Sequence, residues 1–75
     1  MESQEIEKLL QDAFQESEVT VQGMDGKYQV NIRSDAFAGL NQVKRQQAVY
    51  KVLNPHIASG AIHAVSMNLS TSEGS

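Results

Sequence analysis

Cysteine is absent from this 75-residue chain, and that absence excludes more chemistry than any other feature of its composition. The chain can form no disulfide, no thiolate nucleophile and no thiolate metal ligand. A bound metal would have to use His56, His63 or carboxylates, or ligands brought by another molecule. No apolar run approaches the roughly 18 to 20 residues that cross a membrane. We therefore expect a soluble, cytoplasmic protein without membrane contact, with one domain over residues 1–70 and a flexible tail over residues 71–75.

The net charge of −3 conceals a segregation of charge along the chain. Residues 1–25 carry seven acidic residues against one lysine, whereas residues 26–60 carry five basic residues against one aspartate. Such a charge distribution can steer a partner, but it differs from the uniformly basic surface of an autonomous nucleic-acid-binding protein.

Hydrophobic periodicity predicts a helix followed by a hairpin in the first half of the chain. Apolar residues at helical spacing indicate a helix over residues 3–16, with Ser3 as its N-cap. Alternation of apolar and polar residues indicates strands over residues 18–23 and 27–33, joined by turn residues at 23–26.

The second half predicts a helical crossover and a third strand. Asn41 is the expected cap of a helix that runs to Leu53, where Asn54 and Pro55 end it before a short helical turn that stops at Gly60. Residues 62–69 form the last strand, which should pair in parallel with the second because the crossover is long enough. The predicted fold is α+β, in the order α-β-β-α-α-β, with a three-stranded mixed sheet covered by helices on one face.

A helical wheel assigns two faces to the second helix. The face predicted to pack on the sheet contains Val43, Gln46, Val49, Tyr50 and Leu53. The face predicted to meet water contains Asn41, Lys44, Arg45, Ala48 and Lys51. Lys44, Arg45 and Lys51 are either an ordinary solvated surface or an electrostatic patch for nucleic-acid phosphates or an acidic partner.

His63 is the sharpest candidate for chemistry, because it lies between Ile62 and Ala64 at the start of an apolar strand. Taken alone, it is most simply a structural histidine with a local hydrogen bond. We expect His56, just after a proline, to be a surface histidine. Neither has a nucleophile in a recognisable arrangement, so catalysis is not expected.

Recognition of RNA by a KH-type clamp is not supported by the sequence. The Gly-x-x-Gly loop is absent, since Gly39-Leu40-Asn41-Gln42 has only the first glycine. Aromatic residues number four, and Phe14, Phe37 and Tyr50 fall on apolar faces, away from bases.

The order and spacing of several segments resemble the BolA family of small cytoplasmic regulators and iron-sulfur partners. The resemblance spans roughly residues 1–72, and its main segments are Val43 to Tyr50 and Ile62-His63-Ala64, with Phe37, Gly39, Leu53, Ile57 and Gly60 around them. It implies the same topology, similar to a type II KH domain. The short chain and the Arg-Gln-Gln run after Lys44 are closer to the small bacterial subgroup linked to acid stress.

The resemblance implies that His63 is a ligand to a 2Fe-2S cluster shared with a monothiol glutaredoxin and its glutathione, and that the isolated chain holds no cofactor. Relatives often take a second His or Cys ligand from the loop between the first two strands. Here the cluster-proximal loop is Gly23-Met24-Asp25-Gly26-Lys27, and Lys27 stands where the histidine is expected. A protonated lysine is no ligand. This leaves an incompletely coordinated cluster, a nonprotein fourth ligand, or a complex without iron.

The predicted function is therefore that of a noncatalytic partner of a monothiol glutaredoxin in cluster trafficking or in iron and redox sensing, with a link to stress. The alternative is a DNA- or RNA-binding transcriptional regulator that uses the basic second helix. A third interpretation is a cofactor-free adaptor. We expect the isolated protein to be a monomer or a weak dimer.

Overall fold

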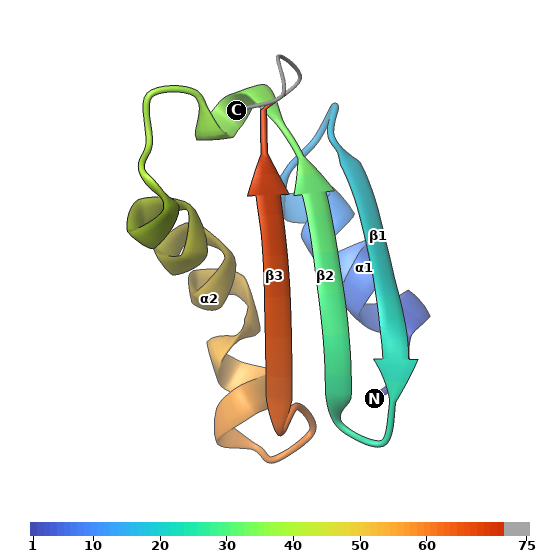
Figure 1. The fold of residues 1–75 in the computed structure, drawn as a ribbon. Helices are drawn as coiled ribbons and strands as arrows, with labels where there is room; N and C mark the ends of the chain where they lie inside the picture. Colours follow the sequence, from blue (N-terminus) through green and yellow to red (C-terminus); the bar gives the residue numbers. More distant parts are fainter. Residues whose placement is uncertain (72–75) are drawn as a thin grey trace.

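The computed structural model describes residues 1–71, which form two α-helices, one 3-10 turn and three strands (Figure 1). In chain order these are α1 (Ser3–Ala13), β1 (Glu18–Met24), β2 (Lys27–Arg33), η1 (Asp35–Phe37), α2 (Gln42–Ala58) and β3 (Ala64–Ser70). The α+β class is confirmed, while the likeness to a type II KH domain stays a prediction.

The three strands form one mixed sheet in the order β1-β2-β3. β1 and β2 are antiparallel, with Val21 opposite Val30. β2 and β3 are parallel, with Lys27 opposite Ala64 at one end and Arg33 opposite Ser70 at the other. The predicted parallel pairing is confirmed, and it leaves both outer strands with a free edge.

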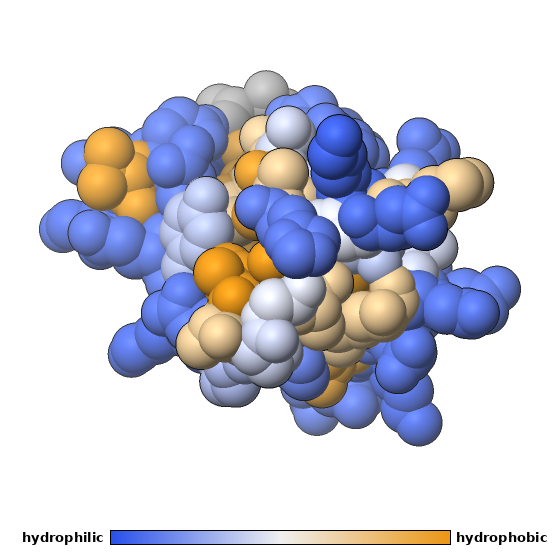
Figure 2. Space-filling view, turned by 90° about the horizontal axis from the view of Figure 1, so that it is seen from below, coloured by the Kyte–Doolittle hydropathy of each residue, from blue (hydrophilic) through white to orange (hydrophobic). Residues whose placement is uncertain are grey.

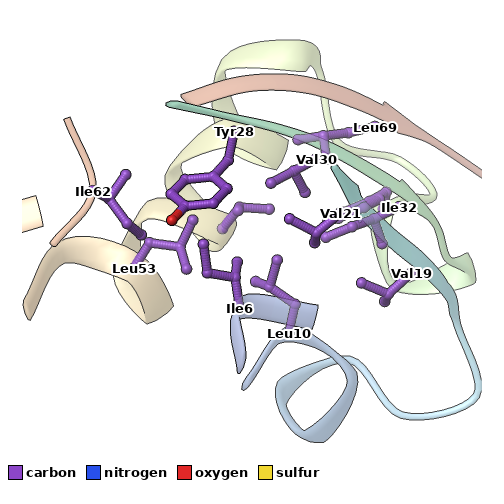
Figure 3. Packing of buried hydrophobic residues seen from close by; sticks show 12 residues of the cluster. Ile6, Leu10, Val19, Val21, Tyr28, Val30, Ile32, Leu53, Ile62 and Leu69 are labelled. Atoms are coloured by element: carbon purple, nitrogen blue, oxygen red, sulfur yellow. The ribbon is translucent and has the colours of Figure 1, made fainter. Parts of the chain in front are cut away.

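One face of the sheet is buried and the other is open. Figure 1 shows α1 behind β1 and β2, and α2 beside β3. Strand residues alternate between the two faces, so every second side chain enters the core (Figure 3). The buried apolar residues are Ile6, Leu10, Val19, Val21, Tyr28, Val30, Ile32, Phe37, Val49, Leu53, Ile62 and Leu69.

The first helix begins at Ser3 as predicted, but its cap and its last residue differ from the prediction. Its N-cap is Glu2 rather than Ser3, and the Glu2 backbone N–H donates to Oε1 of Glu5 at 3.0 Å. A carboxylate three residues into the helix can satisfy this N–H, so serine is not needed as the cap. The helix ends at Ala13, after which Phe14 leaves the helix and its ring packs 5.4 Å from the ring of Phe37.

The predicted break at Asn54 and Pro55 is wrong, because α2 continues through both residues to Ala58. Proline removes one backbone hydrogen bond from the helix. Leu53, which is fully buried, and the half-buried Ile57 lie four residues apart on one helix face, so both reach the core only if the helix continues. The burial of these two side chains offsets the lost bond. Asn41 is confirmed as the N-cap, since its Oδ1 accepts from the backbone N–H of Lys44 at 2.9 Å.

The predicted faces of α2 are wrong at five positions. Of the residues predicted to face the sheet, Val43, Gln46 and Tyr50 are exposed. Of those predicted to face water, Arg45 is buried and Ala48 packs half-buried against the core. Val43 is 60% exposed and Tyr50 is 36% exposed, whereas Arg45 is only 7% exposed. The helix is rotated from its predicted orientation, so Arg45 rather than Val43 faces the sheet together with Val49 and Leu53.

Arg45 is held by backbone carbonyl groups. Its Nε donates to the carbonyl oxygen of Leu40 at 2.9 Å and its NH1 to that of Leu69 at 3.1 Å. The next carbonyl of β3, at Ser70, accepts from the N–H of Ser34 on the side of β2. Adjacent carbonyls of a strand point to opposite sides, so that of Leu69 lies on the free edge of β3. Arg45 thus fastens α2 to the edge of the sheet and covers part of it.

Thr71, the first residue of the predicted tail, is buried, and residues 72–75 lie outside the described part of the chain. Within residues 1–71, neither helix has the length and apolar character needed to cross a membrane.

Replacement of the buried arginine should lower stability sharply. Arg45→Ala removes the two charge-assisted hydrogen bonds that the guanidinium donates to the carbonyl oxygens of Leu40 and Leu69. We therefore expect the free energy of unfolding to fall by about 2 kcal/mol. The matched control on the exposed face, Lys44→Ala, should change it by less than about 0.5 kcal/mol. Urea unfolding followed by circular dichroism measures both, and equal effects would contradict the buried role of Arg45.

Candidate functional site

A tight turn joins β1 to β2 at one end of the sheet. Met24 pairs with Lys27, so the turn has only two central residues, Asp25 and Gly26. Both have positive φ, 56° for Asp25 and 83° for Gly26. Positive φ at both central positions is what a type I′ turn requires, and Asp-Gly is among the sequences that favour it. The strand β1 is therefore one residue longer than predicted.

The same turn fixes the beginning of β3. The carbonyl oxygen of Gly26 accepts the backbone N–H of His63 at 2.7 Å and that of Ala64 at 3.0 Å. These two bonds bring His63, far away in sequence, next to the predicted cluster-proximal loop. His63 itself precedes the strand, which begins at Ala64 rather than at Ile62. Ile62 is buried and anchors this segment to the core.

The imidazole ring of His63 lies against Gly26. A Cβ atom built on Gly26 would lie 3.1 Å from Cγ and 3.3 Å from Nε2 of the ring, and well inside van der Waals contact with Cδ2. His63 is nevertheless exposed, and within residues 1–71 its ring makes no hydrogen bond. It is therefore not the buried, hydrogen-bonded structural histidine that its apolar neighbours suggest. The ring is supported on one side and open to a partner on the other.

Lys27 and Met24 lie on the open face of the sheet. Lys27 alternates with the buried Tyr28 and is flanked by its strand partners Met24 and Ala64. Met24 is 73% exposed, the most exposed of the large apolar side chains. Figure 2 looks onto this end of the molecule and shows apolar side chains reaching the surface among hydrophilic ones. The loop thus offers a soft thioether and a cation beside His63, and Asp25 is its one carboxylate.

A shallow hollow adjoins the turn on the side of the chain's first residues. Residues 1–4 and 23–26 line it together with Tyr28. The Tyr28 hydroxyl donates to the carbonyl oxygen of Met1, which ties the start of the chain to the hairpin. His63 does not line this hollow, so the hollow and the imidazole are separate features.

The chain does not assemble a complete metal site in the part that the structure describes. No group of three His, Asp or Glu side chains converges within residues 1–71. His56 is half-buried in the last turn of α2, and the structure does not place it in a ligand set with His63. A metal at this end of the molecule would therefore need most of its ligands from elsewhere.

The predicted basic patch loses its central member. Lys44 and Lys51 are exposed and lie two helical turns apart on one side of α2, but Arg45 is buried and bonded to carbonyls. Val43 and Tyr50 are exposed beside these lysines. The outer surface of α2 is thus a mixed apolar and basic stripe.

Sequence reasoning singled out His63 and its loop but missed the part played by Gly26. A glycine in an Asp-Gly turn signals a positive φ. Its contact with a histidine 37 positions later depends on the parallel register of β2 and β3, which no local pattern reveals.

Comparison with known proteins gives consistent matches over nearly the whole chain. A family model described as BolA-like protein matches residues 7–74. A protein from Acinetobacter guillouiae, described as an uncharacterized protein in the rpoN-murA intergenic region, is 44% identical over 73 residues, which are 97% of this chain and 88% of the relative. The acid stress protein IbaG of Escherichia coli (strain K12) is 41% identical over 95% of this chain and 84% of its own.

The fold has solved counterparts as well. The BolA domain of SufE1 from Arabidopsis thaliana superposes with a TM-score of 0.85 at 29% sequence identity, over 95% of this chain and 92% of that domain. The architecture described above is therefore that of experimentally determined structures.

The two histidines should differ in chemical reactivity. His63 is exposed and His56 is half-buried, so diethylpyrocarbonate should modify His63 first. Peptide mapping by mass spectrometry over a time course measures the two rates, and the variant His63→Gln should retain only the slower reaction. Equal rates for the two imidazoles would contradict the exposed position of His63.

Proposed function

The chain belongs to the BolA-like family, and from that premise we propose that it is a noncatalytic partner of a monothiol glutaredoxin in iron-sulfur cluster trafficking or in iron and redox sensing. The observation that carries this proposal is the position of His63. Its imidazole is exposed at the end of the sheet and supported by the hairpin turn. Such a group can ligate an iron atom that another protein presents, as imidazole does in Rieske centres.

The donor set suits a shared 2Fe-2S cluster better than a resident one. The chain contains no thiolate, and no three candidate ligands converge within its described part. His63 would provide one ligand, while the cysteine of glutaredoxin and the thiol of glutathione would provide others. The hairpin turn has no histidine, and its Lys27 cannot ligate iron while protonated. When bound, the cluster would supply electron-transfer chemistry, and imidazole ligation tends to raise its reduction potential.

The exposed stripe of α2 supplies the docking surface in this proposal. Lys44 and Lys51 provide positive charge, and Val43 and Tyr50 provide apolar area between them. Exposed tyrosine is enriched where proteins meet other proteins. The mixture therefore favours an acidic protein surface over nucleic-acid phosphates as the partner.

The competing role of DNA- or RNA-binding regulator loses support from the burial of Arg45. Only Lys44 and Lys51 of the three predicted contacts remain available to phosphates, and each phosphate contact adds to affinity in a salt-dependent way. The name of the Escherichia coli relative supports a link of this chain to acid stress, and we include that link in the proposal.

Removal of the proposed ligand should abolish the cluster signature without loss of folding. We expect wild-type protein, reconstituted anaerobically with glutaredoxin, glutathione, iron and sulfide, to give a heterodimer whose visible absorption and circular dichroism differ from those of the glutaredoxin homodimer. His63→Ala should lose that spectrum, and the matched control His56→Ala should keep it. If His63→Ala forms the same coloured complex as wild type, the ligand assignment is wrong; tight but colourless wild-type complexes would indicate a cofactor-free adaptor.

Charge reversal on α2 should weaken docking separately from ligation. The double variant Lys44→Glu, Lys51→Glu should bind glutaredoxin more weakly than wild type, and the difference should shrink as salt increases. His63→Ala should retain cluster-free docking in the same titration by calorimetry. Unchanged binding of the double variant, combined with loss of binding to duplex DNA, would support the regulator instead.

A further inference from the structure

We propose that Gly26 is the positioning residue for His63. Because glycine has no Cβ, the imidazole ring can occupy the space beside Gly26 and is held there. The contact itself can be tested on the isolated chain, while the role of the held ring as an iron ligand rests on the proposed function. No pattern in the sequence pairs these two residues, because they are brought together only by the fold.

The packing around Gly26 leaves no room for a side chain. The Cδ2 atom of the ring occupies the position where a Cβ would project, with Cγ at 3.1 Å and Nε2 at 3.3 Å from that position. Any other residue at this position must displace the imidazole or shift the turn.

The backbone of Gly26 also contacts His63, through hydrogen bonds. Its carbonyl accepts the N–H groups of both His63 and Ala64, at 2.7 and 3.0 Å. These bonds fix the Cα of His63 beside the turn, and the missing Cβ then lets Cδ2 of the ring approach the Cα of Gly26 edge-on. Backbone and side chain of His63 are therefore both set by one residue.

A ring held in this way has lost much of its rotational freedom before any partner arrives. Prior ordering lowers the entropy cost of forming a bond to a ligand or metal. Gly26 would therefore raise the affinity of His63 for its target without touching that target.

Nuclear magnetic resonance of the isolated protein tests the contact directly. In wild type we expect a strong nuclear Overhauser effect between Hδ2 of His63 and the Hα protons of Gly26, with Hα–Hβ couplings of His63 typical of one χ1 rotamer. In Gly26→Ala the effect to residue 26 should weaken and the couplings should move toward rotamer averages. Absence of the contact in wild type would overturn the proposal.

A matched control separates the missing Cβ from backbone strain. Gly39 has nearly the same φ as Gly26, +79° against +83°, but nothing lies within 4 Å of a Cβ built on it. Gly39→Ala should therefore carry a similar strain and leave the His63 couplings as in wild type. If Gly26→Ala does not fold, Gly26→Asn introduces the same Cβ in a residue that tolerates positive φ. Unchanged His63 couplings in a folded residue-26 variant would overturn the proposal.

Cluster reconstitution with the same variants extends the test to function. The residue-26 variant should need more glutaredoxin to reach the heterodimer spectrum, whereas Gly39→Ala should titrate as wild type does. If His63→Ala forms that spectrum unaltered, the proposed function fails while the magnetic resonance result on Gly26 stands. If His63→Ala loses the spectrum but the residue-26 variant titrates as wild type, positioning by Gly26 is overturned.

Discussion

The carbonyl oxygen of Gly26 is the point on which the candidate site depends. It accepts two backbone N–H groups, from His63 and Ala64, and so sets where β3 begins against β2. A shift of one residue in that register would turn every side chain of β3 to the opposite face and move Leu69 out of the core. The same interaction therefore determines both the packing of the sheet and the placement of the imidazole at its end.

The basic side chains of α2 have two different roles, one structural and one at the surface. Arg45, the buried cation of α2, is used to fasten that helix to the free edge of β3 through carbonyls. Lys44 and Lys51 remain on the surface, where charge can guide a partner. The chain has no cysteine and a single exposed imidazole at the hairpin. In the proposed function it would therefore give one ligand to the shared cluster, and the partner would supply the rest.

Much of the fold could be predicted from the sequence, because local periodicity decides it: the hairpin, the crossover helix and the parallel third strand all follow from alternation and spacing. The errors have non-local causes. A helical wheel predicts Val43 in the core and Arg45 in water, because the buried side of the wheel is chosen by polarity. The carbonyl on the sheet edge that binds Arg45 comes from a distant strand, which the wheel does not contain. Pro55 did not end α2, since burial of apolar residues on both sides of it favours continuation. Local sequence patterns do not predict that His63 lies at the hairpin. Family resemblance implies it, and the parallel register of β2 and β3 produces it.

The most direct test of the central claim is pulsed electron paramagnetic resonance of the reduced complex with glutaredoxin, with ¹⁵N-histidine incorporated only in this chain. The account predicts a ¹⁵N hyperfine coupling of the size seen for imidazole bound to iron, retained in His56→Ala and lost in His63→Ala. A reduced cluster that shows only the weak couplings of backbone nitrogens would contradict it, because the iron would then have no ligand from this chain's imidazoles.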